Sequence, residues 1–216
     1  MPQIVVDNIS KKFGKNVIFK GASLSIEKGC IVGIVGANGV GKSVLFKLIS
    51  GIYRVDSGHI FVHNKEIGKD FDFPPNMGIF IDSPGFVQIF SGFKNLKMLA
   101  EIKGIISDND IREAMTLVGL DPSNNTPVRN YSLGMKQKLG IAQAIMENQD
   151  LLLFDEPFNA LDVESHQNMR KLAQRLKQDQ KTILLTSHNS DILELCDYIY
   201  KIEDQHIEPC DRALLI

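Results

Sequence analysis

The chain has 216 residues, a formal net charge of −2, 44% hydrophobic residues and 23% charged residues, values typical of a folded globular protein. This length suits one large α/β domain or two small ones. Both charge signs are interspersed, without the basic stripe of nucleic-acid-binding proteins, so we expect no nucleic-acid partner. The 3 cysteines form no CxxC pair, so neither a disulfide framework nor a zinc site is indicated. No apolar run reaches the roughly 18 residues of a membrane span, and the start "MPQIVVDNISKKF" lacks a signal-peptide core. We expect a soluble, cytosolic protein.

Short β-type runs alternate with longer helical patterns along the chain. Before residue 30, "QIVVDNIS" and "VIFKGASLSIEKG" indicate an antiparallel β portion, which residues 57–67 join. Further strands are expected at residues 31–36, 77–81, 151–155, 182–187 and 198–202, and helices at 44–50 and 163–178. This order predicts the α/β class, with a mostly parallel sheet and helices packed on it.

The strand signal vanishes between about residues 83 and 146. Apolar residues there repeat with helical spacing in three stretches, and the third helix is expected to begin near Ser132. We expect one domain over residues 1–216, in which an α/β core (about 1–82 and 147–216) carries an inserted helical subdomain (about 83–146).

"GANGVGKS", Gly36 to Ser43, fits the phosphate-loop pattern G-x-x-x-x-G-K-[ST] between a predicted strand and a predicted helix. Glycines let backbone N–H groups turn towards phosphate oxygens, and the helix start adds its positive dipole end. Lys42 would reach the β- and γ-phosphates, and Ser43 would offer its hydroxyl to Mg²⁺. The residues expected to bind nucleotide here are Gly36, Asn38, Gly39, Gly41, Lys42, Ser43 and Val44. A chance glycine-rich turn is the alternative.

Two further strand ends carry chemistry. Asp155 follows the apolar run "LLLF" and is expected on the Mg²⁺ side of the site, and Glu156 is expected to act as general base on water. The alternative is an acidic strand end in solvent. His188 follows "LLTS" at the same sheet edge, and we expect it to contact the γ-phosphate, although a lone histidine is more often a plain surface or core residue.

Together these residues resemble the ATP-binding cassette (ABC) ATPases, the nucleotide-binding subunits of ABC transporters, in the family's motif order and over essentially the whole chain. "YSLGM" (131–135) stands where the family has its LSGGQ signature, and "FNALD" resembles the D-loop ending at Asp162. The resemblance implies that Phe13 stacks on adenine, with a plain core phenylalanine as the alternative. It also implies that cassettes pair head to tail, so that Ser132 and Gly134 contact the nucleotide of a second subunit.

The sequence departs from the family pattern at two places. Leu133 and Met135 replace a glycine and the glutamine of the signature, and Asp82 stands where the family usually has glutamine. With "SPGF" after Asp82, the pattern is similar to the ATPases of bacitracin-resistance exporters. We expect Asp82 to take part in catalysis and Mg²⁺ binding.

The resemblance implies an Mg²⁺-dependent ATPase that drives a separate membrane permease from its cytoplasmic face. The alternative is an ABC ATPase acting in translation or DNA repair, but the chain shows one compact cassette without their coiled coils or second cassette. A GTPase or small-molecule kinase would leave the signature unexplained, and a non-catalytic nucleotide-binding module would not need Glu156 and His188. Whether the second cassette is identical stays open, and the sequence is silent on the transported substrate.

Overall fold

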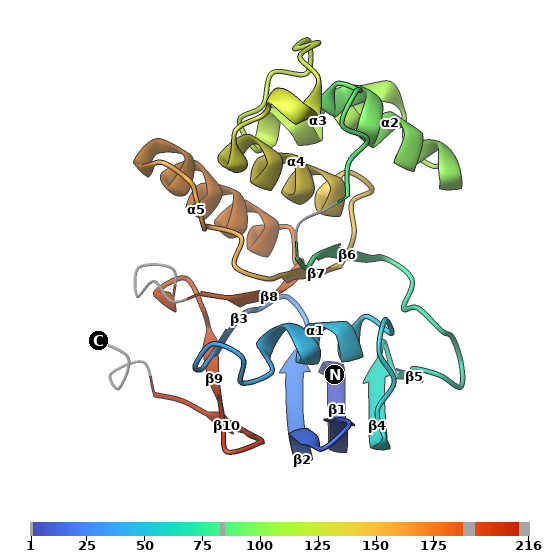
Figure 1. Ribbon diagram of the computed structural model, residues 1–216, viewed down its shortest axis with the longest axis vertical. Helices are drawn as coiled ribbons and strands as arrows, with labels where there is room; N and C mark the ends of the chain where they lie inside the picture. The colour runs from blue at the N-terminus through green and yellow to red at the C-terminus, as the bar shows by residue number, and fades with distance from the viewer. Residues whose placement is uncertain (1, 83–84, 188–192, 212–216) are drawn as a thin grey trace.

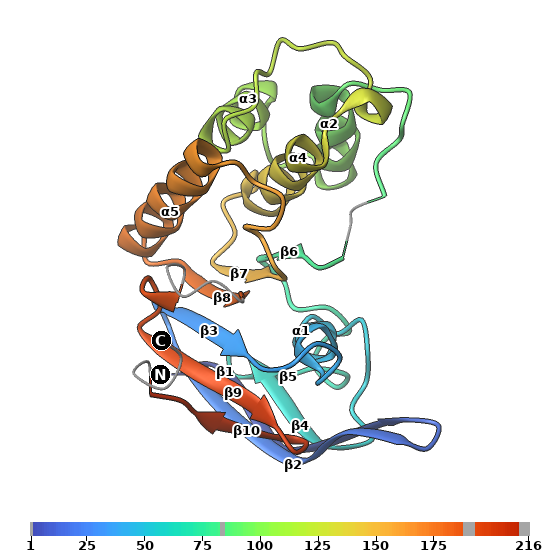
Figure 2. The same cartoon turned by 60° about the vertical axis from the view of Figure 1, so that its left-hand side comes forward.

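The protein is described here by a computed structural model covering residues 2–82, 85–187 and 193–211. Its elements form layers (Figures 1 and 2): a helical layer, a mainly parallel sheet, one helix, and an antiparallel sheet. The helical layer contains α2 (Gly92–Lys103), α3 (Asp108–Leu117) and α4 (Leu133–Ile145), with α5 (Val163–Gln178) beside it. Helix α1 (Lys42–Ile49) lies between the two sheets. The helix expected over 163–178 is confirmed at both ends.

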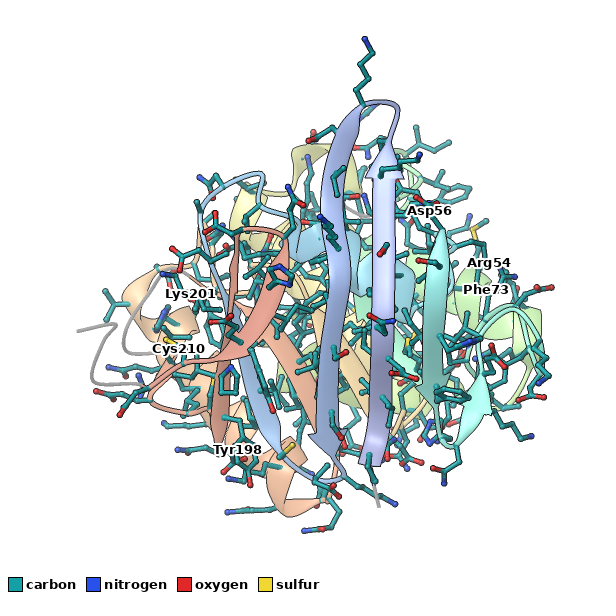
Figure 3. All side chains as sticks on the ribbon, turned by 90° about the horizontal axis from the view of Figure 1, so that it is seen from below. Arg54, Asp56, Phe73, Tyr198, Lys201 and Cys210 are labelled. Atoms are coloured by element: carbon teal, nitrogen blue, oxygen red, sulfur yellow. The ribbon has the colours of Figure 1, made fainter. Side chains whose placement is uncertain are left out.

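The antiparallel sheet, seen from below in Figure 3, has the strand order β2-β1-β4-β5. Its strands are β1 (Pro2–Phe13), β2 (Asn16–Glu27), β4 (Ser57–Val62) and β5 (Lys65–Glu66). Along β2, the side chains of Ala22, Leu24 and Ile26 are buried and those between them are exposed. This alternation is typical of a sheet that covers a core with one face only, and the expected antiparallel β portion is confirmed.

The second sheet has the order β10-β9-β3-β8-β7-β6. Its strands are β3 (Ile31–Val35), β6 (Met77–Phe80), β7 (Leu151–Phe154), β8 (Thr182–Thr186), β9 (Tyr198–Glu203) and β10 (His206–Pro209). All neighbours are parallel except β9 and β10. The expected α/β class is therefore confirmed, and β10 is an additional strand that the sequence pattern did not predict.

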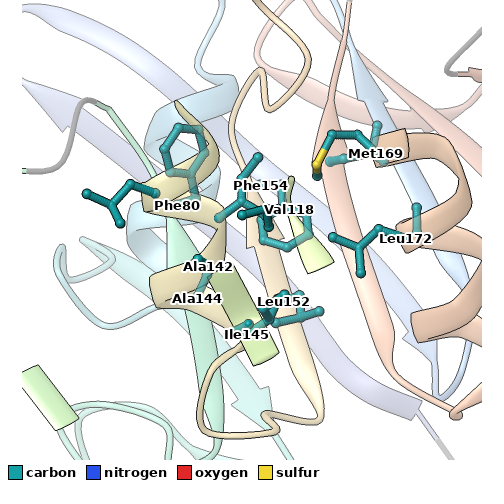
Figure 4. Packing of buried hydrophobic residues seen from close by; sticks show 14 of the residues in the cluster. Phe80, Val118, Ala142, Ala144, Ile145, Leu152, Phe154, Met169 and Leu172 are labelled. Carbon is teal, nitrogen blue, oxygen red and sulfur yellow. The ribbon is translucent and has the colours of Figure 1, made fainter. Parts of the chain in front are cut away.

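Both faces of the parallel sheet are buried, which gives the molecule two apolar cores. From β7, Leu151 and Leu153 enter the core shared with α1 and the antiparallel sheet. Leu152 and Phe154 enter the core shared with α4, α5 and the other helices, as Figure 4 shows. Because successive strand residues point to opposite faces, one short apolar run supplies both cores.

Within the described residues, no helix combines the length and the apolar character needed to cross a bilayer.

Candidate functional site

Strands β3, β7 and β8, whose following residues were expected to form the nucleotide site, end at one edge of the parallel sheet. Strand register pairs Ile34 of β3 with Thr186 of β8, Leu185 of β8 with Phe154 of β7, and Phe154 with Phe80 of β6. Parallel strands in this register end together, so the next residues of each strand lie along a single edge. The carboxyl edge of an open α/β sheet is where such folds bind ligands.

The loop from Gly36 to Gly41 joins β3 to α1 and wraps the start of that helix. Gly41 has φ +121°, and a Cβ built on it would lie 2.6 Å from Ile18 Cγ2, so the turn requires glycine. Lys42 is buried, and its Nζ donates hydrogen bonds to the carbonyl oxygens of Gly36 at 2.8 Å and Ala37 at 3.2 Å. The ammonium is therefore held against its own loop, within reach of an anion bound there.

A hydroxyl–carboxylate cluster lies beside the loop. The Ser43 hydroxyl donates a hydrogen bond to Oδ2 of Asp155, and the Thr186 hydroxyl donates to Oδ1 of Asp155 at 2.7 Å. The backbone N–H of Glu156 donates to Thr186 Oγ1 at 2.8 Å. Thr186, at the end of β8, thus holds both acidic residues, which follow the neighbouring strand β7.

The phosphate loop and the two acidic residues, Asp155 and Glu156, line an open cleft of about 230 Å³. The cleft lining comprises Asn38, Gly39, Gly41, Lys42, Ser43, Val44, Asp155 and Glu156. The lining includes Asp155, Glu156 and every residue expected to bind nucleotide at the phosphate loop except Gly36, whose carbonyl oxygen accepts a hydrogen bond from Lys42.

Two helix starts adjoin the loop that follows Glu156. Ser132 is the N-cap of α4, where its Oγ accepts a hydrogen bond from the Met135 N–H at 3.2 Å. A Cβ on Gly134 would lie 2.9 Å from the carbonyl oxygen of Ala160, so α4 approaches the loop after Glu156 closely. Asp162 caps α5, and hydrogen bonds from Ser165 hold the pKa of Asp162 below its usual value.

Asp82 is not among the residues that line the cleft. Its carboxylate forms an ion pair with Lys47 Nζ on α1 at 2.7 Å and is largely exposed. This contact, ahead of smaller effects, raises the pKa of Lys47 above its usual value. The structure therefore places Asp82 next to the site, on a cation that the sequence analysis did not consider.

Phe13 ends β1 with 43% of its surface exposed, so it is not a core phenylalanine. Its ring meets Tyr53 edge-on at a centroid distance of 5.3 Å, and Lys11 Nζ lies 5.2 Å from its centre. An exposed ring with one side supported is compatible with stacking on a base. His188 lies outside the described residues.

Comparisons with known proteins decide the family. The ABC transporter family model matches residues 19–159. The chain belongs to the ABC transporter family of ATP-binding proteins. It is 38% identical over 212 residues to the ABC transporter ATP-binding protein YybJ of Bacillus subtilis (strain 168), covering 98% of this chain and 97% of that protein.

Two other relatives carry transport names. The bacitracin transport ATP-binding protein BcrA of Enterococcus faecalis is 31% identical, with 94% of this chain and 67% of BcrA covered. The lantibiotic transport ATP-binding protein SrtF of Streptococcus pyogenes is 33% identical, with coverage of 90% and 84%. The expected similarity to the ATPases of bacitracin transport systems is confirmed.

A solved ABC cassette shares the fold. It is the dimeric, post-hydrolysis form of the ATP-binding cassette MJ0796 bound to ADP and Pi, with a TM-score of 0.85 and 22% identity over 95% of this chain and 96% of that one. At this identity the match concerns the fold, and it confirms the α/β cassette architecture expected from the sequence.

The cassette contains three site-forming residues that the sequence reasoning missed. Thr186 bridges Asp155 and Glu156, Lys47 pairs with Asp82, and Gln137 on α4 donates from Nε2 to the carbonyl oxygen of Glu156 at 2.7 Å. Thr186 could have been found, because a polar residue that ends a buried parallel strand lies at the site edge. Lys47 and Gln137 have no such signal, since only the packing of helices against the sheet brings them there.

Proposed function

We propose that this chain is the ATP-hydrolysing subunit of an ABC transporter whose membrane-spanning permease is a separate chain. The observation that carries the proposal is the cleft in which the phosphate loop faces Asp155 and Glu156. Transport is also the role named for the relatives BcrA and SrtF. A role in translation or DNA repair has no comparable support.

In the proposed mechanism the loop N–H groups and the α1 N-terminus bind the phosphates of ATP. Lys42 exchanges part of its contact with the loop carbonyls for the β- and γ-phosphates, which stabilises the charge that moves during transfer. The Glu156 carboxylate, beside the same cleft, accepts a proton from the attacking water. His188 is proposed to contact the γ-phosphate.

Mg²⁺ fits the oxygen groups present. Ser43 and Asp155 place a hydroxyl and a carboxylate side by side at the phosphate loop, and Mg²⁺ takes oxygen ligands together with substrate phosphates. These two residues would hold the ion, which when bound neutralises phosphate charge. The metal and catalytic role of Asp82 stays a prediction, since its carboxylate would first have to leave Lys47.

A second cassette would complete the site. Ser132 and Gly134 lie at the exposed start of α4, where N–H groups and the helix dipole favour an anion. We propose that this anion is the γ-phosphate of the partner's ATP, with Asp162 at the same interface and Phe13 stacking on the adenine. Bound ATP would then favour the state in which the two cassettes are paired, and hydrolysis of the ATP would let the cassettes separate.

The permease would dock on the helical segment, residues 83–130, and hold the protein at the cytoplasmic face of the membrane. This segment exposes large apolar side chains, including Ile89 at 65%, Ile102 at 78% and Ile105 at 65%. A permease docked on this segment would remove such side chains from water.

Hydrolysis of ATP by the purified chain, measured over a wide range of protein concentration, tests the proposal. We expect specific activity to rise with concentration, because two chains complete each other's sites, and to fall at least a hundredfold in Glu156→Gln. Tight ATP binding with no hydrolysis at any concentration would indicate that a different cassette or the permease is required. No ATP binding would refute the function.

A further inference from the structure

The backbone at Glu156 has an unfavourable conformation. Its φ is +50°, in the left-handed region that residues with a side chain rarely adopt. Proline at position 157 adds a second restriction, because the ring disfavours helical backbone angles in the residue before it. Such a conformation persists only when surrounding contacts hold it.

Side-chain hydrogen bonds hold this residue from both sides of its backbone. Its N–H donates to Thr186 Oγ1 at 2.8 Å, and its carbonyl oxygen accepts from Gln137 Nε2 at 2.7 Å. The Asn159 N–H also donates to that oxygen, more distantly at 3.2 Å. Thr186 anchors the residue to the sheet, whereas Gln137 anchors it to the helical layer.

Gln137 belongs to the first half of α4, whose N-cap is Ser132. The two residues are five positions apart, or roughly 7.5 Å along the helix axis. Gly134, between them, also packs against the carbonyl of Ala160. One rigid helix therefore carries the anion-binding start proposed for the partner's nucleotide and the donor that reaches this chain's own Glu156.

We propose that Gln137 is a positioning residue for Glu156, holding its backbone so that the carboxylate faces the cleft. The inference rests on the proposed function, in which Glu156 is the general base. Gln137 touches neither water nor phosphate in this mechanism and acts only through the Glu156 carbonyl.

The test replaces Gln137 with methionine, which has the same length and no donor, and with lysine, which restores a donor. Gln143→Met is the matched control, because Gln143 lies on α4 and donates no hydrogen bond to Glu156 in the described part of the chain. We expect Gln137→Met to lower kcat about tenfold with KM for ATP unchanged, Gln137→Lys to recover part of the rate, and Gln143→Met to match the wild type.

A second readout does not depend on activity. Amide hydrogen exchange at Glu156 and Asn159 should be about five- to tenfold faster in Gln137→Met, because loss of the anchor lets this turn open more often. Unchanged exchange would overturn the proposal. An unchanged kcat in Gln137→Met, in a preparation where Glu156→Gln is inactive, would also overturn it.

The two proposals fail in different ways. If Glu156→Gln hydrolyses ATP like the wild type, the general-base role is wrong, whatever Gln137 does. In the Glu156→Gln background, Gln137→Met should cause no further loss of residual hydrolysis, because both changes act on one group. An additional tenfold loss there would show that Gln137 acts elsewhere and would overturn the positioning role.

Discussion

Thr186 is fully buried at the end of β8, and its hydroxyl joins the two acidic residues of the site. The oxygen accepts from the Glu156 N–H while the hydroxyl hydrogen goes to Asp155. Both functions need an oxygen at that point, and a carbon of the same shape would leave buried polar groups without partners.

Thr186→Val should therefore lower the free energy of unfolding by about 1–3 kcal/mol and lower kcat at least tenfold. Urea denaturation and ATP hydrolysis measure these effects. The matched control is Thr182→Val, at the start of the same strand, where the hydroxyl accepts from the Gly29 N–H at 2.9 Å. It should lose stability and keep its hydrolysis, whereas a wild-type kcat in Thr186→Val would contradict the bridging role.

Asp82, which stands where the family usually has glutamine, forms an ion pair with Lys47. We expect Asp82→Ala to lower kcat for ATP hydrolysis about tenfold while stability changes by no more than ~1 kcal/mol, since partly exposed ion pairs contribute little. Asp72→Ala, which breaks an ion pair with Arg54 elsewhere on the surface, is the control. If both variants hydrolyse Mg·ATP like the wild type, Asp82 has no role in the reaction.

At the scale of elements, the start of α4 has two proposed tasks. Ser132 caps the helix through its hydroxyl, and the same N-terminus is proposed to hold a phosphate of the second cassette. A capping serine could serve the helix alone, so the two tasks need to be measured separately.

Ser132→Asp separates them. Aspartate caps a helix as well as serine does, so stability should stay unchanged, whereas its negative charge repels phosphate and should lower hydrolysis at least tenfold. Ser91→Asp at the N-cap of α2, where Ser91 accepts from the Lys94 N–H at 3.3 Å, is the control and should retain activity. Full activity in Ser132→Asp would leave only the capping role.

At the scale of the whole molecule, the helical layer and the parallel sheet share one apolar core, to which β7 contributes. Leu139 of α4 is fully buried in it, together with Leu152 and Phe154 of the strand. A helical segment that shares its core with the sheet is expected to unfold with it. The assignment of residues 1–216 to a single domain makes the same prediction.

Leu139→Ala tests whether the helical segment and the sheet unfold together. It should lower the free energy of unfolding by about 2–5 kcal/mol and shift the urea midpoints of α2 and β8 together, as followed by hydrogen exchange. Ile102→Ala removes an exposed side chain from the same layer and should change stability little. If α2 unfolds in Leu139→Ala before β8 does, the helical segment is an independent unit.

The sequence by itself determined most of the elements, with β10 as an exception, and the residues that follow the buried parallel strands. Buried strands are continuous apolar runs, and a parallel sheet brings the residues after Val35, Phe154 and Thr186 to one edge. Lys42, Asp155 and Glu156 could therefore be assigned to one site in advance. The tertiary structure alone decided which side chains support them. Gln137 lies on α4 and Lys47 on α1. The sequence around each residue does not show whether its side chain faces solvent or the site, because long-range contacts set the angle at which a helix packs.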